Sequence, residues 1–297
     1  MKRLALALTL SLASLALFAQ SREVEQDMFE AMRPTDKAAV VAVHYGSDAD
    51  SPCIRLFNQK LQEAFPQCAL REAWTSLRAI AEMNSRGQVR QTLTHTLEDL
   101  YKQGFTHVLI QSANMSDGVE MAYIRHEAES LSRHFRVVRI GSALLDEPAD
   151  CAEVLRSLKA EYGQKKTANV LVVGCEGSDA PAHSALLDYM LREQGYADWF
   201  VVAVEGFPTL DHLQRQLKQR KLKKVNLIPF SFEPTDAALL DGLRQTLQKA
   251  GLKVTESTLP LGMLDGVAQH FVNLARHAAL YRSYSPLELK MQESLGF

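Results

Sequence analysis

AVVAVHYGSD at residues 39–48 and VLVVGCEGSD at residues 170–179 are two copies of one phrase, an apolar run that stops at Gly-Ser-Asp. A continuous run of valines and alanines is typical of a parallel strand that is buried on both faces. The Gly-Ser-Asp that follows allows a tight turn and can cap the next helix. Because functional groups in open α/β sheets lie beyond the carboxyl ends of strands, the repeat predicts one site built from two related halves.

Apolar runs and amphipathic stretches alternate along the rest of the chain. This order predicts an α/β fold of two similar lobes, each a parallel sheet of about four strands flanked by helices, with a cleft between the lobes. The predicted strands cover residues 38–44, 69–74, 107–112, 136–140, 170–174, 199–204, 225–229 and 253–257. The predicted helices cover residues 53–64, 75–85 extending through 93–103, 118–135, 181–194, 209–220, 235–250 and 266–281.

The N-terminus has the pattern of a secretory signal peptide. Lys2 and Arg3 precede an apolar run from Leu4 to Phe18, and Ala19 is a small residue suited to cleavage. The run is too short to favour a membrane-spanning helix. We therefore expect an exported protein, periplasmic or peripheral on an outer membrane. The predicted division is a signal peptide at 1–19, a polar lead at 20–37, a first lobe at 38–160 and a second lobe at 161–297.

Composition excludes some functions. The 297-residue chain has a formal net charge of −2, and no basic stretch alternates with aromatic residues, so nucleic acid is not an expected partner. The four cysteines show no CxxC motif and no spacing typical of a disulfide framework. Walker, GxGxxG, HExxH and GxSxG motifs are absent from the sequence.

Chemically capable side chains follow several predicted strands. Among them, His44 ends a buried apolar run, where a polar side chain is costly, so a ligand role competes with that of a satisfied core histidine. Glu176 ends the matching run of the second lobe, where packing does not explain a carboxylate, and this favours a functional role. The wider set comprises Tyr45, the segment 114–120 with Met115 and Glu120, Cys175, His183, Glu205, Glu233 and Asp236.

In these phrases the chain resembles the class II tetrapyrrole chelatases, particularly the anaerobic sirohydrochlorin cobaltochelatases of the CbiK type. The resemblance covers nearly all of the chain after the signal peptide. Glu120 falls on the position of a metal-binding glutamate in the family's Gly-x-Glu loop. The segments that carry the resemblance are AVVAVHYGSDAD, EAFPQCALREAWTS (63–76), VLIQSANMSDGVEMAYI (108–124) and VEGFPTLDHLQRQLKQRKLKKVNLIPF (204–230).

The chain also departs from the family pattern at two metal-binding histidines. Glu176 stands where the family has a Gly-His-Gly turn, and Ala237 stands where a second histidine follows a Gly-Asp turn. The site therefore changes from imidazole-rich to carboxylate-rich. Glu120 and Glu176 can still accept the pyrrole protons that metal insertion releases, and His44 is the expected replacement imidazole.

The resemblance and the export pattern together imply a tetrapyrrole ligand. The first hypothesis is an exported haem-binding protein for iron uptake, with possible insertion or removal of a divalent metal such as iron or cobalt. His44, Tyr45, His183 and Met115 are the candidate haem contacts, and Glu120, Glu176 and His44 the candidate metal ligands. An outer-membrane transporter and a homo-oligomer are the possible partners. The alternatives are an active periplasmic cobaltochelatase or ferrochelatase, and a non-catalytic solute- or metal-binding protein.

Overall fold

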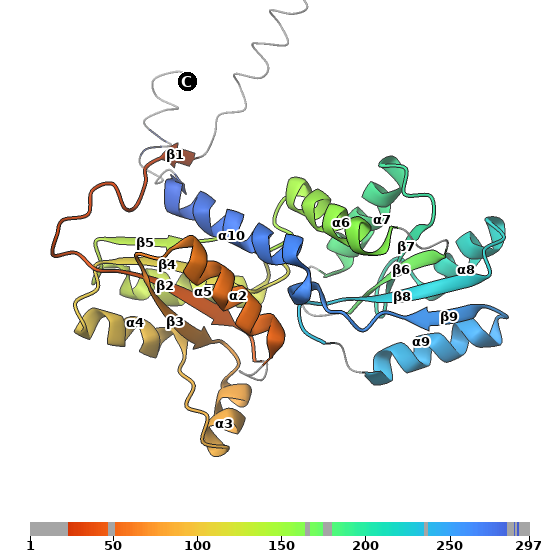
Figure 1. Ribbon diagram of the computed structural model, residues 1–297, viewed down its shortest axis with the longest axis horizontal. Helices are drawn as coiled ribbons and strands as arrows, with labels where there is room; N and C mark the ends of the chain where they lie inside the picture. Colours follow the sequence, from red (N-terminus) through yellow and green to blue (C-terminus); the bar gives the residue numbers. More distant parts are fainter. Residues whose placement is uncertain are drawn as a thin grey trace, which may run out of the picture.

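The computed structural model describes residues 23–46, 51–163, 167–174, 180–234 and 237–283, with residues 288 and 290. Two lobes lie side by side, each built around its own parallel sheet (Figure 1). The strand order is β3-β2-β4-β5 in the first lobe and β7-β6-β8-β9 in the second. The two orders are equivalent, which supports the duplication suggested by the repeated phrase.

The first lobe follows the predicted alternation of strands and helices. Its strands are β2 (Ala38–His44), β3 (Ala69–Trp74), β4 (His107–Ser112) and β5 (Val137–Ile140). Its helices are α2 (Pro52–Ala64), α3 (Leu77–Ser85), α4 (Leu93–Lys102) and α5 (Val119–Ser132). Helix α2 covers one face of the sheet, while leucines of α4 and apolar residues of α5 pack on the other.

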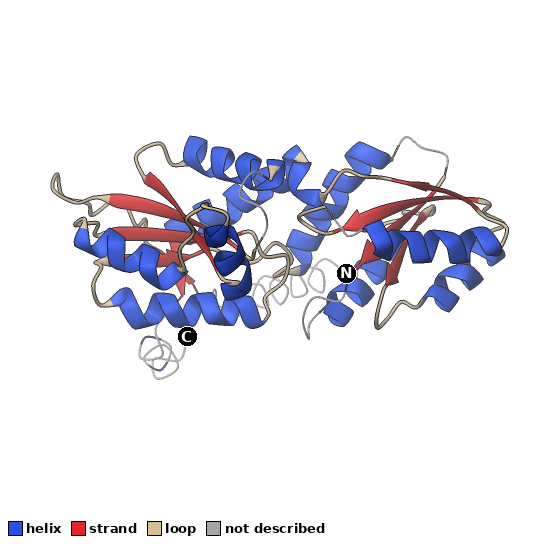
Figure 2. Ribbon diagram, turned by 90° about the horizontal axis from the view of Figure 1, so that it is seen from below, coloured by secondary structure: helices blue, strands red, loops and turns tan. Residues whose placement is uncertain are grey.

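The second lobe repeats this plan. Its strands are β6 (Ala168–Val173), β7 (Trp199–Ala203), β8 (Lys224–Phe230) and β9 (Lys253–Glu256). Its helices are α7 (Ala180–Glu193), α8 (Leu210–Gln219) and α9 (Ala237–Lys249). Figure 2 shows helices on both faces of each sheet. The predicted fold class, two four-stranded parallel sheets flanked by helices, is confirmed.

Two details of the helices differ from the sequence-based prediction. The stretch predicted as one extended helix is two helices, because α3 ends near Gly87, whose φ of +79° lies in the left-handed region that favours glycine. Helix α6 (Pro148–Tyr162) was not predicted and connects the two lobes. A capping box between Glu147 and Asp150 starts this helix, with Pro148 in its first turn.

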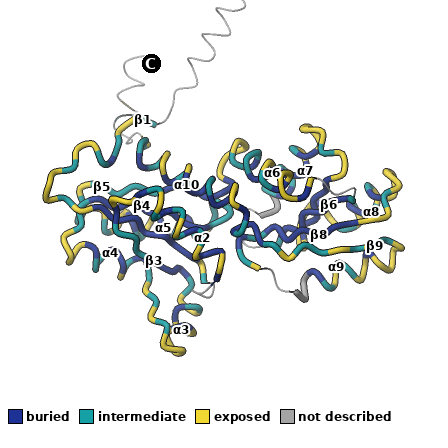
Figure 3. Tube along the Cα trace, in the orientation of Figure 1, coloured by how far each residue is buried: buried dark blue, intermediate teal, exposed yellow. Residues whose placement is uncertain are grey.

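The last long helix departs from the predicted division into lobes. Helix α10 (Asp265–Leu280) follows the second lobe in sequence, yet it packs against α2, α6, β4 and β5, over the first lobe (Figure 1). Its buried residues, including Val267 and Phe271, belong to an apolar core that also contains residues of the second sheet, such as Leu171 and Ile228. The lobes thus share one continuous core, visible as buried trace across the centre of Figure 3.

The polar lead also has structure. Strand β1 (Glu23–Glu25) pairs antiparallel with β10 (Tyr281–Ser283), which follows α10 directly. Met28, just beyond β1, is buried in the shared core. Within the part of the chain that the structure describes, no helix combines the length and apolar character needed to span a membrane.

Candidate functional site

Each sheet has one topological switch point. In the first lobe the chain leaves β2 toward β3 on one side and returns to β4 on the other, so the crevice lies beyond the carboxyl ends of β2 and β4. In the second lobe the equivalent crevice lies beyond β6 and β8. The segments that follow these four strands are therefore the expected location of a functional site.

A hydrogen bond joins segments that follow two of those strands across the lobes. Ser51, the N-cap residue of α2 after β2, donates its hydroxyl to Glu233 Oε2 at 2.5 Å, and Glu233 follows β8. Ser51 Oγ also accepts from the backbone N–H of Cys53, which caps the helix. The second carboxylate oxygen, Glu233 Oε1, is buried without a hydrogen-bond partner among the described residues. The two switch points are therefore adjacent at Ser51 and Glu233.

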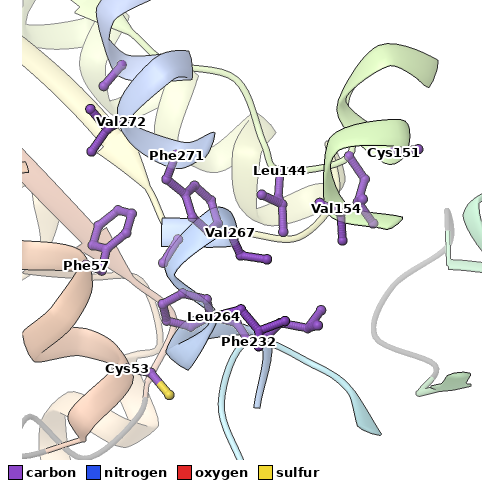
Figure 4. Close-up of a cluster of buried hydrophobic side chains, with 14 of the residues drawn as sticks. Cys53, Phe57, Leu144, Cys151, Val154, Phe232, Leu264, Val267, Phe271 and Val272 are labelled. Atoms are coloured by element: carbon purple, nitrogen blue, oxygen red, sulfur yellow. The ribbon is translucent and has the colours of Figure 1, made fainter. Parts of the chain in front are cut away.

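A cluster of buried apolar side chains packs next to this junction (Figure 4). Phe57 of α2, Phe232 beside Glu233 and Phe271 of α10 make mutual edge-to-face contacts, with ring centroids 5.2–6.0 Å apart. Gly262 fits close to this cluster: a Cβ atom there would lie 2.7 Å from the Phe232 carbonyl oxygen and 2.8 Å from the Cβ of Cys53. These contacts fix where the segment after β8 meets α2.

Glu120 lies at the edge expected for a site residue. It is the second residue of α5, the helix that follows β4, and its side chain is half-buried in the first helical turn. A carboxylate at this end of a helix is favoured by the helix dipole. Its neighbour Val119 is 73% exposed. Burial, followed by the charges of Glu127 and Glu120, raises the pKa of Tyr123.

His44 lies inside the first lobe. With period two along β2, its side chain shares the face of Val40 and Ala42 and contacts the rings of Phe57 and Trp74, with centroids 5.6 and 5.5 Å away. It is 1% exposed, and neither ring nitrogen has a hydrogen-bond partner within the described structure. Burial lowers the pKa of His44 to about 4, although the nearby Asn58 side chain favours the charged form. The imidazole is therefore neutral at pH 7.

The remaining described candidates are spread over both lobes. Tyr45 is 57% exposed beyond β2. Met115 is half-buried and packs against the shared core after β4. His183 is half-buried in the first turn of α7, beyond β6. Glu205 is exposed just beyond β7.

Several predicted site residues cannot be placed. Cys175, Glu176 and Asp236 lie outside the described residues, and the side chain of Ala237 is likewise not described. Among the residues that are described, no group of three or more His, Cys, Asp or Glu side chains is arranged to hold a metal ion. The predicted roles of Glu176 and of the metal set therefore stay predictions.

The described cysteines do not supply metal ligands. Cys53, Cys68 and Cys151 are buried and free. Burial raises the pKa of each thiol to about 11, and for Cys53 the charge of Glu233 adds to the effect. Because the thiolate is the form that binds metals, these side chains are inert core residues.

Two hollows lie away from the switch points. One, of about 500 Å³, lies at the amino ends of β2 and β3 beside Phe29 and Phe105. The other, of about 200 Å³, lies between β7 and α9 and is lined mainly by apolar residues such as Val202 and Leu243. Neither includes a predicted site residue.

Fold and junction together define a two-lobed α/β protein in which the two switch points meet between the lobes. Residues 38–279 match the model of the cobalt chelatase (CbiK) family, and the chain belongs to this family. It is 28% identical over 211 residues to the sirohydrochlorin cobaltochelatase of Salmonella typhimurium, covering 69% of this chain and 80% of that protein. It is 26% identical over 205 residues to sirohydrochlorin cobaltochelatase CbiKC of Nitratidesulfovibrio vulgaris, covering 66% and 72%.

Solved structures agree on the fold. SirB from Bacillus subtilis with Fe³⁺ superposes with a TM-score of 0.59 at 16% identity, covering 82% of this chain and 96% of SirB. DR2241 from Deinococcus radiodurans, described as a multi-domain protein with similarity to chelatases, superposes with a TM-score of 0.56 at 14% identity, covering 80% and 55%. At these identities the likeness establishes architecture alone.

Sequence reasoning missed one member of the junction. Glu233 was recognised as a residue after a strand, but its partner Ser51 was not. The available signal was the helix-start pattern Ser51-Pro52, a capping residue followed by proline. That pattern marks the start of a helix, and it carries no information about a partner in the other lobe.

Proposed function

We propose that the protein is a metal chelatase that inserts a divalent metal, cobalt or iron, into a tetrapyrrole of the sirohydrochlorin class. One observation carries the proposal: in a chain of the cobalt chelatase family, the segments after β2 and β8 meet at the Ser51–Glu233 hydrogen bond. The names of the two curated relatives support sirohydrochlorin as the tetrapyrrole and cobalt as the metal.

The proposed chemistry depends on carboxylates. Insertion of a divalent metal exchanges two pyrrole N–H protons for the metal, so the protein must accept protons and orient the metal. Glu120, at the start of α5, and Glu176 are the proposed proton acceptors and metal contacts. A carboxylate can accept a proton and can also contact a divalent metal, although imidazole, which the family's two histidines supply, suits cobalt and iron better.

A turnover assay tests this proposal. Purified protein, sirohydrochlorin and Co²⁺ are expected to give the metallated product with multiple turnovers, followed by the change in the visible spectrum. Glu120→Gln and Glu176→Gln should each lower kcat by about 100-fold, the usual contribution of a general base. Glu82→Gln, in an exposed ion pair with Arg86 on α3, is the matched control and should keep the wild-type rate. Unchanged rates in both site variants would contradict the assigned roles.

Haem binding for iron acquisition is the second candidate. It is favoured by the secretion pattern at residues 1–19 and by the loss of both family histidines. An outer-membrane transporter would then be the partner, and a homo-oligomer would suit the role. His44 fits an axial haem ligand poorly, because it is 1% exposed between Phe57 and Trp74. His183 and Met115, which are half-buried, fit better.

A haemin titration distinguishes the two candidates. Haem acquisition predicts a shifted Soret band that His183→Ala or Met115→Ala abolishes, while His44→Ala leaves the band in place. Chelatase activity alone predicts metal turnover with sirohydrochlorin and no axial-ligand signature with haemin. Absence of any spectral change with haemin would exclude the haem role.

A further inference from the structure

Six exposed lysines gather at the end of the second lobe that is remote from the first lobe. Helices α8 and α9 end there and strands β8 and β9 begin there, at the amino edge of the second sheet (Figure 1). The six side chains, which we name the basic edge, are Lys218, Lys221, Lys223, Lys224, Lys249 and Lys253. The lysine ion pairs of the described structure involve Lys60 and Lys102 instead, so the charges of the basic edge are not neutralised within it.

Two of these lysines face each other across neighbouring strands. Lys224 at the start of β8 is the register partner of Lys253 at the start of β9. The backbone N–H of Lys253 also donates to the carbonyl oxygen of Lys223 at 2.9 Å, which brings a third lysine to the same place. Like charges at opposite positions of adjacent strands repel and destabilise the pairing. An anion bound at this edge would relieve that repulsion.

A third position carries its lysine at a conformational cost. Lys221, just after α8, has a φ of +54°, in the left-handed region that favours glycine. Its turn is closed by the same pattern of backbone hydrogen bonds as the turns at Gly104 after α4 and Gly251 after α9, where φ is +76° and +82°. The helix end would therefore be more stable with glycine at position 221, and stability does not explain the lysine.

The helix dipole accounts for only part of the basic edge. Lys218 and Lys249 lie in the last turns of α8 and α9, where a positive charge is favourable. The other four lysines lie outside the helices, so this effect does not explain them. Described acidic residues at the same end of the lobe, such as Asp198 before β7, lie on the far side of β6 from β8 and β9.

The spread of the lysines fits a broad anionic surface better than a single small anion. They are distributed over two helix ends and two strand starts, and the two hollows described above lie elsewhere. The exposed large apolar side chains of the described structure also lie elsewhere, so the basic edge has no aromatic platform for stacking nucleic-acid bases. Exposed lysines that project together from one end of a lobe are suited to the phosphate layer of a membrane.

We propose that the basic edge docks the protein on a membrane surface that contains anionic phospholipid. Lysines near such a surface each strengthen binding about fivefold, and the attraction weakens with salt. The switch points lie at the carboxyl ends of the strands, at the opposite edge of the sheet, so the docked protein keeps the lobe junction open to solvent. Membrane docking agrees with the peripheral location expected from the secretion pattern at residues 1–19.

Cosedimentation with vesicles tests this inference without requiring metal insertion. The quantity measured is the ratio of binding to phosphatidylcholine vesicles with and without phosphatidylglycerol, so an apolar contribution from the N-terminus cancels. Lys224→Gln combined with Lys253→Gln should lower this ratio about 30-fold, and high salt should abolish the preference in wild type. Arg78→Gln combined with Arg133→Gln removes the same charge from exposed positions of the first lobe and should keep the wild-type ratio.

Lys221→Gly separates docking from a structural role. Glycine suits the left-handed turn, so this variant should have a higher thermal transition than wild type while its preference for phosphatidylglycerol falls about fivefold. A lysine retained for the fold alone would give a lower thermal transition and unchanged vesicle binding, which would overturn the inference.

Other results would overturn the inference equally clearly. Equal binding to the two kinds of vesicle, or an equal loss in the Arg78 and Arg133 control, would show that the basic edge does not recognise anionic lipid. Tighter binding to a homopolymeric RNA than to the vesicles at the same salt concentration would assign the lysines to nucleic acid instead. A phosphatidylglycerol preference that is lost only in the basic-edge variants is the result expected.

Discussion

His44 shows how burial can set the charge of a side chain, with the positive charge of Arg90 lowering the pKa further. Its folded-state pKa of about 4 lies below the ordinary value of 6.5, so the unfolded chain binds a proton more readily than the native protein. Above pH 6.5 the histidine is neutral in both states, and its contribution to stability is complete. As the pH falls from 6.5 toward 4, the unfolded chain binds the proton first, so the free energy of unfolding decreases. The full loss, reached below pH 4, amounts to about 3 kcal/mol of unfolding free energy.

Replacing this side chain tests that account. His44→Phe removes two buried nitrogens that make no hydrogen bond, and urea unfolding between pH 7 and 4.5 should show a weaker fall in stability than in wild type. His126→Phe, at an exposed position on α5, is the control and should leave the pH dependence unchanged. A wild-type slope in His44→Phe would show that His44 does not titrate in this range.

At the residue scale, the sequence predicted where the candidate site residues lie better than it predicted which residues they contact. Glu120 could be placed at the start of α5 because the Gly-x-Glu phrase and the end of β4 are both local features. The burial of His44 followed from its place at the end of a continuous apolar run, but whether it pairs was left open. In the structure neither ring nitrogen makes a hydrogen bond, and a Glu72 carboxylate oxygen lies 3.9 Å from Nε2. The Ser51–Glu233 contact depends on how two lobes pack, which local patterns do not report.

At Gly262, where two elements meet, the packing leaves no room for a single methyl group. Gly262→Ala would place a Cβ against the Phe232 carbonyl oxygen and Cys53, so we expect a loss of about 1–3 kcal/mol of unfolding free energy. Gly242→Ala, inside α9 with open space around its Cβ, is the matched control and should be neutral or stabilising by up to about 1 kcal/mol. Equal stability of the two variants in urea unfolding would contradict the packing described at Gly262.

Element boundaries were predictable where one physical cause dominated. The central strands β2 and β4 were located to the residue because each contains a buried apolar run of the kind typical of parallel strands. Helix α6 was not predicted, because the end of the first lobe after the strand at 136–140 was assigned no element. Its start, a glutamate before proline with Asp150 in the first turn, was the overlooked signal.

The shared core predicts that the two lobes unfold together. Trp74 lies in β3 of the first lobe and Trp199 in β7 of the second, and the chain has no other tryptophan. Single-tryptophan variants, Trp74→Phe and Trp199→Phe, each report one lobe. In each variant, the transition followed by fluorescence should coincide with the transition followed by far-UV circular dichroism, as expected when both lobes unfold in one cooperative step.

Phe271→Ala extends this prediction. Phe271 is fully buried in α10, so its truncation should cost about 3–5 kcal/mol and lower both lobes' transitions together. Separate transitions for the two tryptophans, or a loss confined to the first lobe, would show that the lobes are independent. The sequence did not predict this coupling, because the apolar stripe of α10 shows that the helix is buried without showing which lobe it covers.

Metal insertion is the property of the whole molecule that tests the account most directly. The measurement is a single-turnover reaction of stoichiometric protein, sirohydrochlorin and Co²⁺, followed at once by visible absorbance and by a pH indicator in weak buffer. The account predicts a metallated spectrum whose appearance coincides with the release of two protons per cobalt inserted. A bound tetrapyrrole whose spectrum stays metal-free, with no proton release, would contradict it.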